Sequence, residues 1–197
     1  EATLVFSLGQ HDALEQLHRW GGQPLPLNAS CWVKDQTQPD APELLFLRLR
    51  GAVAAVESAC ERLSREAGGT RMDNAETGPD WAACRDQTLP FFNAPAPDLC
   101  LWRLSVPQTA AVISLPFAQL IEWHGAQRWL WAPASAAAEI RSAAAAVNGH
   151  ATLFRAGVDG APGVPRFDRQ TAVIDTITQR LRAEFDPAGI FNPGRMG

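Results

Sequence analysis

The first 72 residues change their hydrophobic period in a set order, and this order limits the fold more than any other feature. Alternating or continuous apolar runs predict strands, whereas apolar residues three or four apart predict helices. The predicted series is strand 2–8, helix 13–20, strand 24–33, strand 43–51, helix 51–67 and a short strand at 70–72. This β-α-β-β-α-β order is that of a ferredoxin-like unit, an antiparallel sheet with its helices on one face.

The same order returns in the second part of the chain. The predicted series there is strand 99–106, a short connector 107–116, a hairpin 118–133 that turns at 124–126, helix 135–147 and strand 150–157. We therefore predict an α+β fold, in which two ferredoxin-like halves at about 1–75 and 98–156 form one antiparallel sheet with helices on one face. Together the halves make a unit spanning 1–160. Ferredoxin-like sheets serve many functions, so this architecture does not by itself indicate one.

Residues 161–197 form a separate C-terminal region. After a loop rich in Gly and Pro, apolar residues at helical spacing predict a helix over about 168–184 with one apolar face. The chain then ends in FDPAGIFNPGRMG, where Asp186-Pro187 and Asn192-Pro193-Gly194 predict turns on either side of Ile190 and Phe191. We expect this rigid apolar segment to dock on another surface.

Composition and charge exclude several classes of function. The net charge of -4 and the pI near 5.5 give no attraction to phosphate backbones, so no nucleic-acid partner is expected. No apolar run approaches the roughly 20 residues of a membrane-spanning helix. The cysteines and histidines are scattered, which favours buried thiols in a cytoplasmic protein over a disulfide framework or a metal site. The chain begins at Glu1 rather than Met, and we expect it to be a piece of a longer protein.

Several segments resemble a known family of flavoproteins. The C-terminal helix with FDPAGIFNPGRM resembles the C-terminus of FAD-linked oxidases of the vanillyl-alcohol oxidase type. The segments LWRLSVP, IEWHGAQRWLWAP and QPLPLNASCW are similar to the E subunit of bacterial glycolate oxidase, a member of that family. The resemblance covers nearly the whole chain, as the second half of such a subunit.

The resemblance implies a fold, a cofactor and a reaction. Such flavoproteins have an N-terminal FAD-binding domain with a glycine-rich loop, then a cap domain whose sheet covers the flavin ring, then a segment that returns to the FAD domain. The chain has no glycine-rich phosphate loop in a strand-loop-helix context. We therefore expect residues 1–160 to be the cap domain, and 161–197 to dock on an FAD domain that this chain lacks.

The implied activity is that of the whole flavoprotein. It is the oxidation of glycolate, or a similar small 2-hydroxy acid, by hydride transfer to FAD. FAD is expected in the full-length protein and not on this chain, which alone should be inactive. The expected partners are the FAD domain and sister subunits of an oxidase complex. We expect the protein to be cytoplasmic, where partner subunits can attach it to the inner membrane.

Four kinds of residue are candidates for this chemistry. Arg103 and Arg128 each stand between aromatic residues on a predicted strand, where they either bind a substrate carboxylate or pair with a carboxylate such as Glu122. His124, at the hairpin turn, is either a catalytic base or an ordinary turn residue. Asn192 and Arg195 either contact the flavin or serve the terminal turn. Tryptophans 102, 123, 129 and 131 are core or interface anchors, or they stack near a flavin.

Two other readings stay open beside the flavoprotein one. The chain can be a free ferredoxin-like module that binds a small acid without catalysis, or a structural module that assembles subunits through its tryptophan-bearing face. Neither requires the rigid DPAGIFNPG segment.

Overall fold

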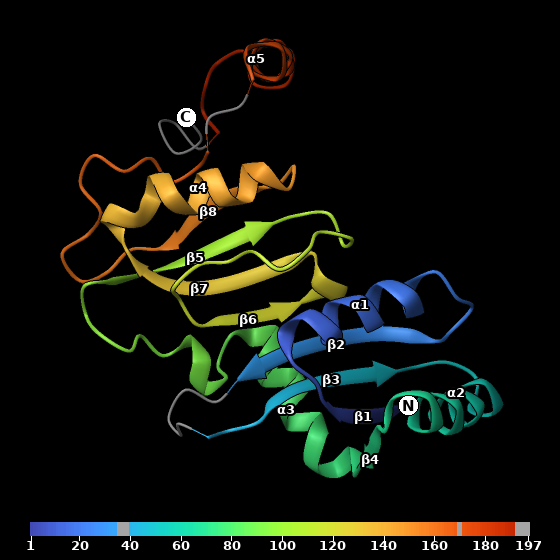
Figure 1. Cartoon of the computed structure of the whole chain (residues 1–197). Coiled ribbons are helices and arrows are strands. Elements are labelled where there is room, and N and C mark those ends of the chain that lie inside the picture. Colours follow the sequence, from blue (N-terminus) through green and yellow to red (C-terminus); the bar gives the residue numbers. More distant parts are fainter. Residues whose placement is uncertain (35–39, 169–170, 192–197) are drawn as a thin grey trace.

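The protein is an α+β structure built on a single antiparallel sheet (Figure 1). The computed structural model describes residues 1–34, 40–168 and 171–191. The strands, in the spatial order β4-β1-β3-β2-β6-β7-β5-β8, are β1 (Ala2–Ser7), β2 (Leu27–Lys34), β3 (Glu43–Leu49), β4 (Thr70–Met72), β5 (Leu99–Ser105), β6 (Gln119–Glu122), β7 (Gln127–Pro133) and β8 (His150–Arg155). The helices are α1 (Gln10–Gly21), α2 (Val53–Ala67), α3 (Asn74–Asp86), α4 (Ala137–Ala146) and α5 (Ala172–Phe185). The predicted fold class is confirmed.

The first half has the strand order of a ferredoxin-like unit, β4-β1-β3-β2. Strand alternation explains which side is covered, because Leu4 and Leu47 lie opposite one another and share a core with residues of α1 and α2. Both side chains are fully buried. We call this side of the sheet the helix face. Thr3 and Arg48, one residue away in the same register, point to the other side.

The second half repeats this order in mirror sequence, β6-β7-β5-β8, but one of its connections is irregular. Helix α4 packs on the helix face through Ile140 and Ala144, beside Trp102. The connection between β5 and β6 contains no helix. This segment is held instead by the side chain of Arg128, which donates to the carbonyls of Ala110 and Ala111.

The two halves join edge to edge through β2 and β6. The strands run antiparallel, with Cys31 opposite Glu122 and Trp32 opposite Ile121. Each of these strands would be an exposed edge in a half that stood alone, so their pairing removes two free edges and makes the eight-stranded sheet continuous. The junction brings residues of both halves within reach of one another.

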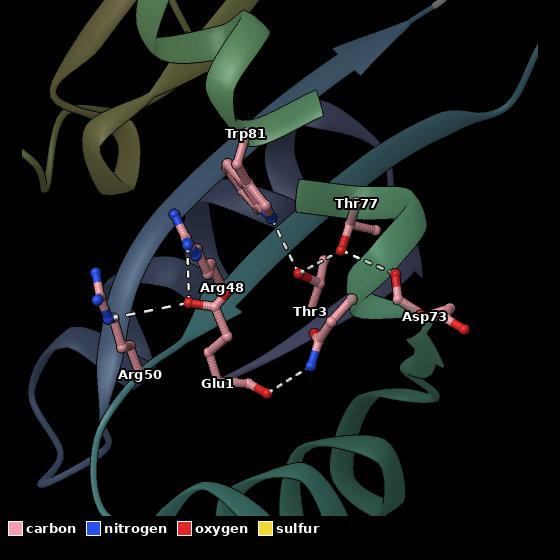
Figure 2. Close-up of polar contacts among 8 residues, drawn as sticks. Glu1, Thr3, Arg48, Arg50, Asp73, Thr77 and Trp81 are labelled. Carbon is pink, nitrogen blue, oxygen red and sulfur yellow. Dashed lines mark hydrogen bonds and ion pairs between the residues drawn. The ribbon is translucent and has the colours of Figure 1, made fainter. Parts of the chain in front are cut away.

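Helix α3 corrects the expectation that all helices cover one face. It packs against the side opposite to α1, where Trp81 Nε1 donates to Thr3 Oγ1 at 2.9 Å and Thr77 Oγ1 donates to the same oxygen at 3.3 Å (Figure 2). Nearby, Arg48 and Arg50 pair with the Glu1 carboxylate, and Asn74 Nδ2 donates to the Glu1 carbonyl (Figure 2). We call this second side of the sheet the α3 face.

Helix α5 stands apart from the sheet, beyond α4 (Figure 1). None of its residues is buried, although its apolar side chains lie at helical spacing. The exposed apolar side chains of this helix and the following turn are Val173, Ile174, Ile177, Leu181, Phe185, Ile190 and Phe191. In the described part of the chain, no helix has both the length and the apolar character needed to cross a membrane.

Candidate functional site

A cleft of about 780 Å³ lies on the α3 face, at the junction of the two halves. One wall is α3, and the other strands and turns that line it are β2, β3, β5, β8, the ends of β6 and β7 and the turn between β6 and β7. We call it the sheet cleft. Its volume is within the range of small-molecule sites, and its lining combines aromatic rings with a few charged groups, as such sites do.

Glu122 is a buried carboxylate in the lining of the cleft, with only 8% of its surface exposed. Its Oε1 accepts hydrogen bonds from Trp129 Nε1 at 2.7 Å and from Gln127 Nε2 at 2.6 Å. Its Oε2 accepts one from the Cys84 thiol at 3.3 Å. These donors are neutral, so hydrogen bonds rather than a counter-charge stabilise the carboxylate. Glu122 is therefore a fixed acceptor at the junction.

Two buried cysteines lie beside this carboxylate. Cys31 on β2 is opposite Glu122 in the strand register, and Cys84 comes from α3. A hydrogen bond with Cys84, together with burial, raises the pKa of the Cys31 thiol well above its usual value. A thiol held protonated is a poor nucleophile at neutral pH. All four cysteines of the chain are buried and free, and the thiol of Cys84 donates to the Glu122 carboxylate.

Arg103 supplies positive charge to the cleft. Its place on β5, opposite Trp129, puts it on the α3 face, and its guanidinium lies 5.7 Å from the centre of the Phe154 ring. The pairing with Glu122 that was weighed as an alternative is not formed. Among the described residues Arg103 has no anionic partner, and its buried Nε has no hydrogen-bond acceptor. The side chain is thus available to a bound anion.

His124 also lines the cleft, at the turn that joins β6 and β7. Its backbone is left-handed (φ 54°, ψ 35°), and its N–H donates to Ser30 Oγ at 2.8 Å. Burial lowers the pKa of His124, so the ring is neutral at pH 7. A neutral imidazole can accept a proton, and the position of His124 is therefore compatible with the predicted role of a base.

The lowered pKa of His124 gives a test of stability against pH. Between its native pKa and the unfolded value of about 6.5, the unfolded chain binds a proton that the folded chain does not. The free energy of unfolding should therefore fall as the pH is lowered from 6.5 through the native pKa. Above pH 7, His124 should contribute nothing to the change of this free energy with pH. We expect His124→Asn, which suits a left-handed residue, to reduce this fall in urea titrations at pH 7.5 and pH 5. An equal fall in the free energy of unfolding for wild type and His124→Asn would contradict the lowered pKa of His124.

Arg128 does not reach the cleft. It lies on the helix face opposite Leu104 and is fully buried. Its guanidinium donates to three main-chain carbonyls: Nε to Gly125 at 3.2 Å, Nη1 to Ala111 at 2.8 Å and Nη2 to Ala110 at 2.7 Å. Burial lowers its pKa to about 10, still well above neutrality. The cation ties the irregular β5–β6 connection to the turn, which leaves its predicted substrate-binding role without structural support.

The remaining candidates lie elsewhere. Asn192 and Arg195 fall outside the described residues. Trp129 and Trp131 share the α3 face, as strand alternation predicted, and Trp129 packs edge-on against Phe92 and Phe154. In the described part of the chain, the side chains grouped closely enough to hold a metal ion are His11, Asp12 and Glu15, which are exposed on α1 and away from the cleft.

The sequence did not single out Glu122 as a site residue. The sequence suggested Glu122 only as an ion-pair partner for an arginine, because a glutamate at the end of a short strand is usually exposed. Its alternation with Ile121 was the available signal, since it puts Glu122 on the same side as Trp129. Helix α3 buries the carboxylate, and no pattern in the sequence predicted that this helix packs on this face of the sheet.

The chain is similar to a curated protein, the glycolate oxidase subunit GlcE of Escherichia coli (strain K12). The two are 36% identical over 194 residues, which is 98% of this chain and 48% of the relative. The chain therefore spans about half the length of the curated relative it matches. No protein-family profile matches the chain, and no solved structure matches it.

Proposed function

We propose that this chain is the substrate-side cap domain of an FAD-dependent oxidoreductase that oxidises glycolate or a similar small 2-hydroxy acid. The observation that carries the proposal is the sheet cleft, which combines an arginine without an anionic partner among the described residues, a neutral histidine and a fixed carboxylate. The similarity to a glycolate oxidase subunit supports the choice of substrate. The rest of the flavoprotein is proposed to correspond to the half of the relative that the match does not span.

The residues of the cleft fit one end of FAD. The cleft has aromatic walls and room for a flat ring beside a small acid. The described residues contain no glycine-rich loop at the start of a helix, so the pyrophosphate would be bound outside this chain. When bound, FAD supplies the acceptor for the hydride of the alcohol carbon.

Each polar residue of the cleft has a proposed task. Arg103 binds the carboxylate of the hydroxy acid and fixes its orientation. His124, neutral because its pKa is lowered, accepts the hydroxyl proton as the hydride leaves. Glu122 holds Trp129 and Gln127 in place through their hydrogen bonds. The residues that carry these tasks and the α3 wall beside them all belong to this chain.

The C-terminal region has a proposed docking role. The apolar side of α5 is exposed, with Val173 at 69% and Phe185 at 81% of their surface accessible. Such a row of apolar side chains is stable in water only when another surface covers it. We assign this surface to the FAD domain of the same protein, because the relative has a second half of about equal length. The tail from Asp186 to Phe191 would extend the same contact.

The test uses the protein expressed from its native locus, with the coding sequence that adjoins it. A yellow product with the spectrum of oxidised flavin, bleached by glycolate without oxygen, is the expected result. A colourless product would contradict the proposal. If the colourless product is still stabilised by glycolate against heat, the alternative of a non-catalytic acid-binding module holds. If glycolate has no effect, the exposed α5 surface favours the alternative of a subunit-assembly module.

A further inference from the structure

The turn at the edge of the sheet cleft has an unfavourable backbone conformation. Three consecutive residues are left-handed: Trp123 (φ 53°), His124 (φ 54°) and Gly125 (φ 97°). Glycine adopts this region freely, and histidine is among the types found there more often. For a residue as bulky as tryptophan it is a genuine outlier. A tryptophan at 123 therefore costs folding free energy that asparagine or glycine would not.

Contacts among the described residues do not explain why tryptophan occupies position 123. Trp123 is 65% exposed. The structure describes all seven tryptophans, and the other six are buried or half-buried. Five of those six donate their indole N–H to another group: Trp32, Trp81, Trp102, Trp129 and Trp131. The turn itself is held by main-chain atoms, since His124 N donates to Ser30 Oγ and Ala126 N donates to the Trp123 carbonyl. Asparagine at 123 would keep both bonds.

We propose that Trp123 is a ligand-contacting residue, whose indole forms a wall of the sheet cleft against which a small carboxylic acid packs. Trp123 lines the cleft between Glu122 and His124, and Arg103 lines the same cleft with a guanidinium available to an anion. An unfavourable backbone conformation at a cleft persists when the side chain has a task there. The class of ligand rests on the proposed function, whereas the role of Trp123 rests on the strain and the exposure of its ring.

The test compares two variants of the 197-residue chain. Trp123→Asn relieves the backbone and removes the ring, whereas Trp123→Phe keeps both the strain and an aromatic ring. We expect Trp123→Asn to raise the midpoint of thermal unfolding by about 2–4 °C. We expect it to weaken glycolate binding at least ten-fold, measured from amide chemical shifts in NMR titrations. Trp123→Phe should leave the midpoint within about 1 °C and should lower the affinity less than Trp123→Asn does.

Several outcomes would overturn the inference. A stabilised Trp123→Asn variant with unchanged affinity would mean that the strain serves no ligand. A destabilised variant would mean that the turn is not strained. A panel of acetate, D-lactate and phosphate separates this inference from the proposed function. If wild type prefers acetate and Trp123→Asn weakens that binding, the role of Trp123 stands and the hydroxy-acid assignment fails. If wild type binds none of the acids, the inference fails, and flavin bleaching still decides the proposed function on its own.

Discussion

Replacing Arg128 by methionine will destabilise the fold by about 3–5 kcal/mol. The guanidinium is fully buried and is bonded to the carbonyls of Ala110, Ala111 and Gly125. Methionine fills a similar volume but donates nothing, so three buried carbonyls lose their partner. Urea unfolding of the 197-residue chain, followed by tryptophan fluorescence, measures the change.

Two further variants show whether the geometry of Arg128 is the cause. Arg128→Lys keeps a charge but cannot reach three carbonyls with one ammonium, and it should fall between wild type and Arg128→Met. Arg71→Met, at an exposed arginine paired with Glu57 on the surface, should change stability little. If Arg128→Met proves as stable as wild type, the β5–β6 connection must be held by its own packing, through Ile113 and its neighbours.

Replacing Arg103 by methionine will strongly weaken the response to glycolate while leaving the fold intact. Arg103 is the cleft arginine that has no anionic partner in the described part of the chain, so a substrate carboxylate would lose its counter-charge. Truncation of one member of a close charge pair costs about 2–5 kcal/mol, which is roughly 30-fold to several thousand-fold. The rate of flavin bleaching by glycolate, measured in the protein from the native locus at several glycolate concentrations, gives the loss.

The control for Arg103 is its own conservative variant. Arg103→Lys keeps the charge, loses the two-pronged geometry and should retain part of the glycolate response. The unfolding free energy of Arg103→Met should stay within about 0.5 kcal/mol of wild type, because methionine can still pack on Phe154. A bleaching rate unchanged by Arg103→Met would contradict the assignment. In that case the cleft does not bind the acid through this residue.

The two arginines show how far the sequence alone could lead. Both stand among aromatic residues on strands, and both had the same two readings. Alternation along β7 puts Arg128 and Trp129 on opposite faces, and pairing with β5 puts Arg103 beside Trp129. The register of β5 against β7 therefore separates them. Register depends on contacts between segments far apart in the chain, which a pattern within one segment does not contain.

Helix α3 shows a second limit. Its segment, NAETGPDWAACRD, has Gly78 and Pro79 in its middle and no apolar stripe, so the apolar period did not predict a helix there. The N-cap residue Asp73, whose side chain accepts from the Ala75 N–H, was a local signal for its start. It is held from outside, by the bonds of Thr77 and Trp81 to Thr3 (Figure 2). The burial of Cys84 on the sheet adds to this. Tertiary packing overrode a weak local propensity, as it often does. Without this helix the sheet cleft would lack a wall, and Glu122 would be exposed.

The sequence by itself determined which segments are strands and helices in both halves, because the period of apolar residues reports the local conformation directly. It also set the apolar side of α5, which is exposed in the structure as a docking surface would be. Only the tertiary structure decided which face carries the cleft, that Arg103 rather than Arg128 lines it, and that Glu122 is buried there. These depend on the pairing of β2 with β6 and on the placement of α3, and both are contacts between distant segments whose energies no local pattern records.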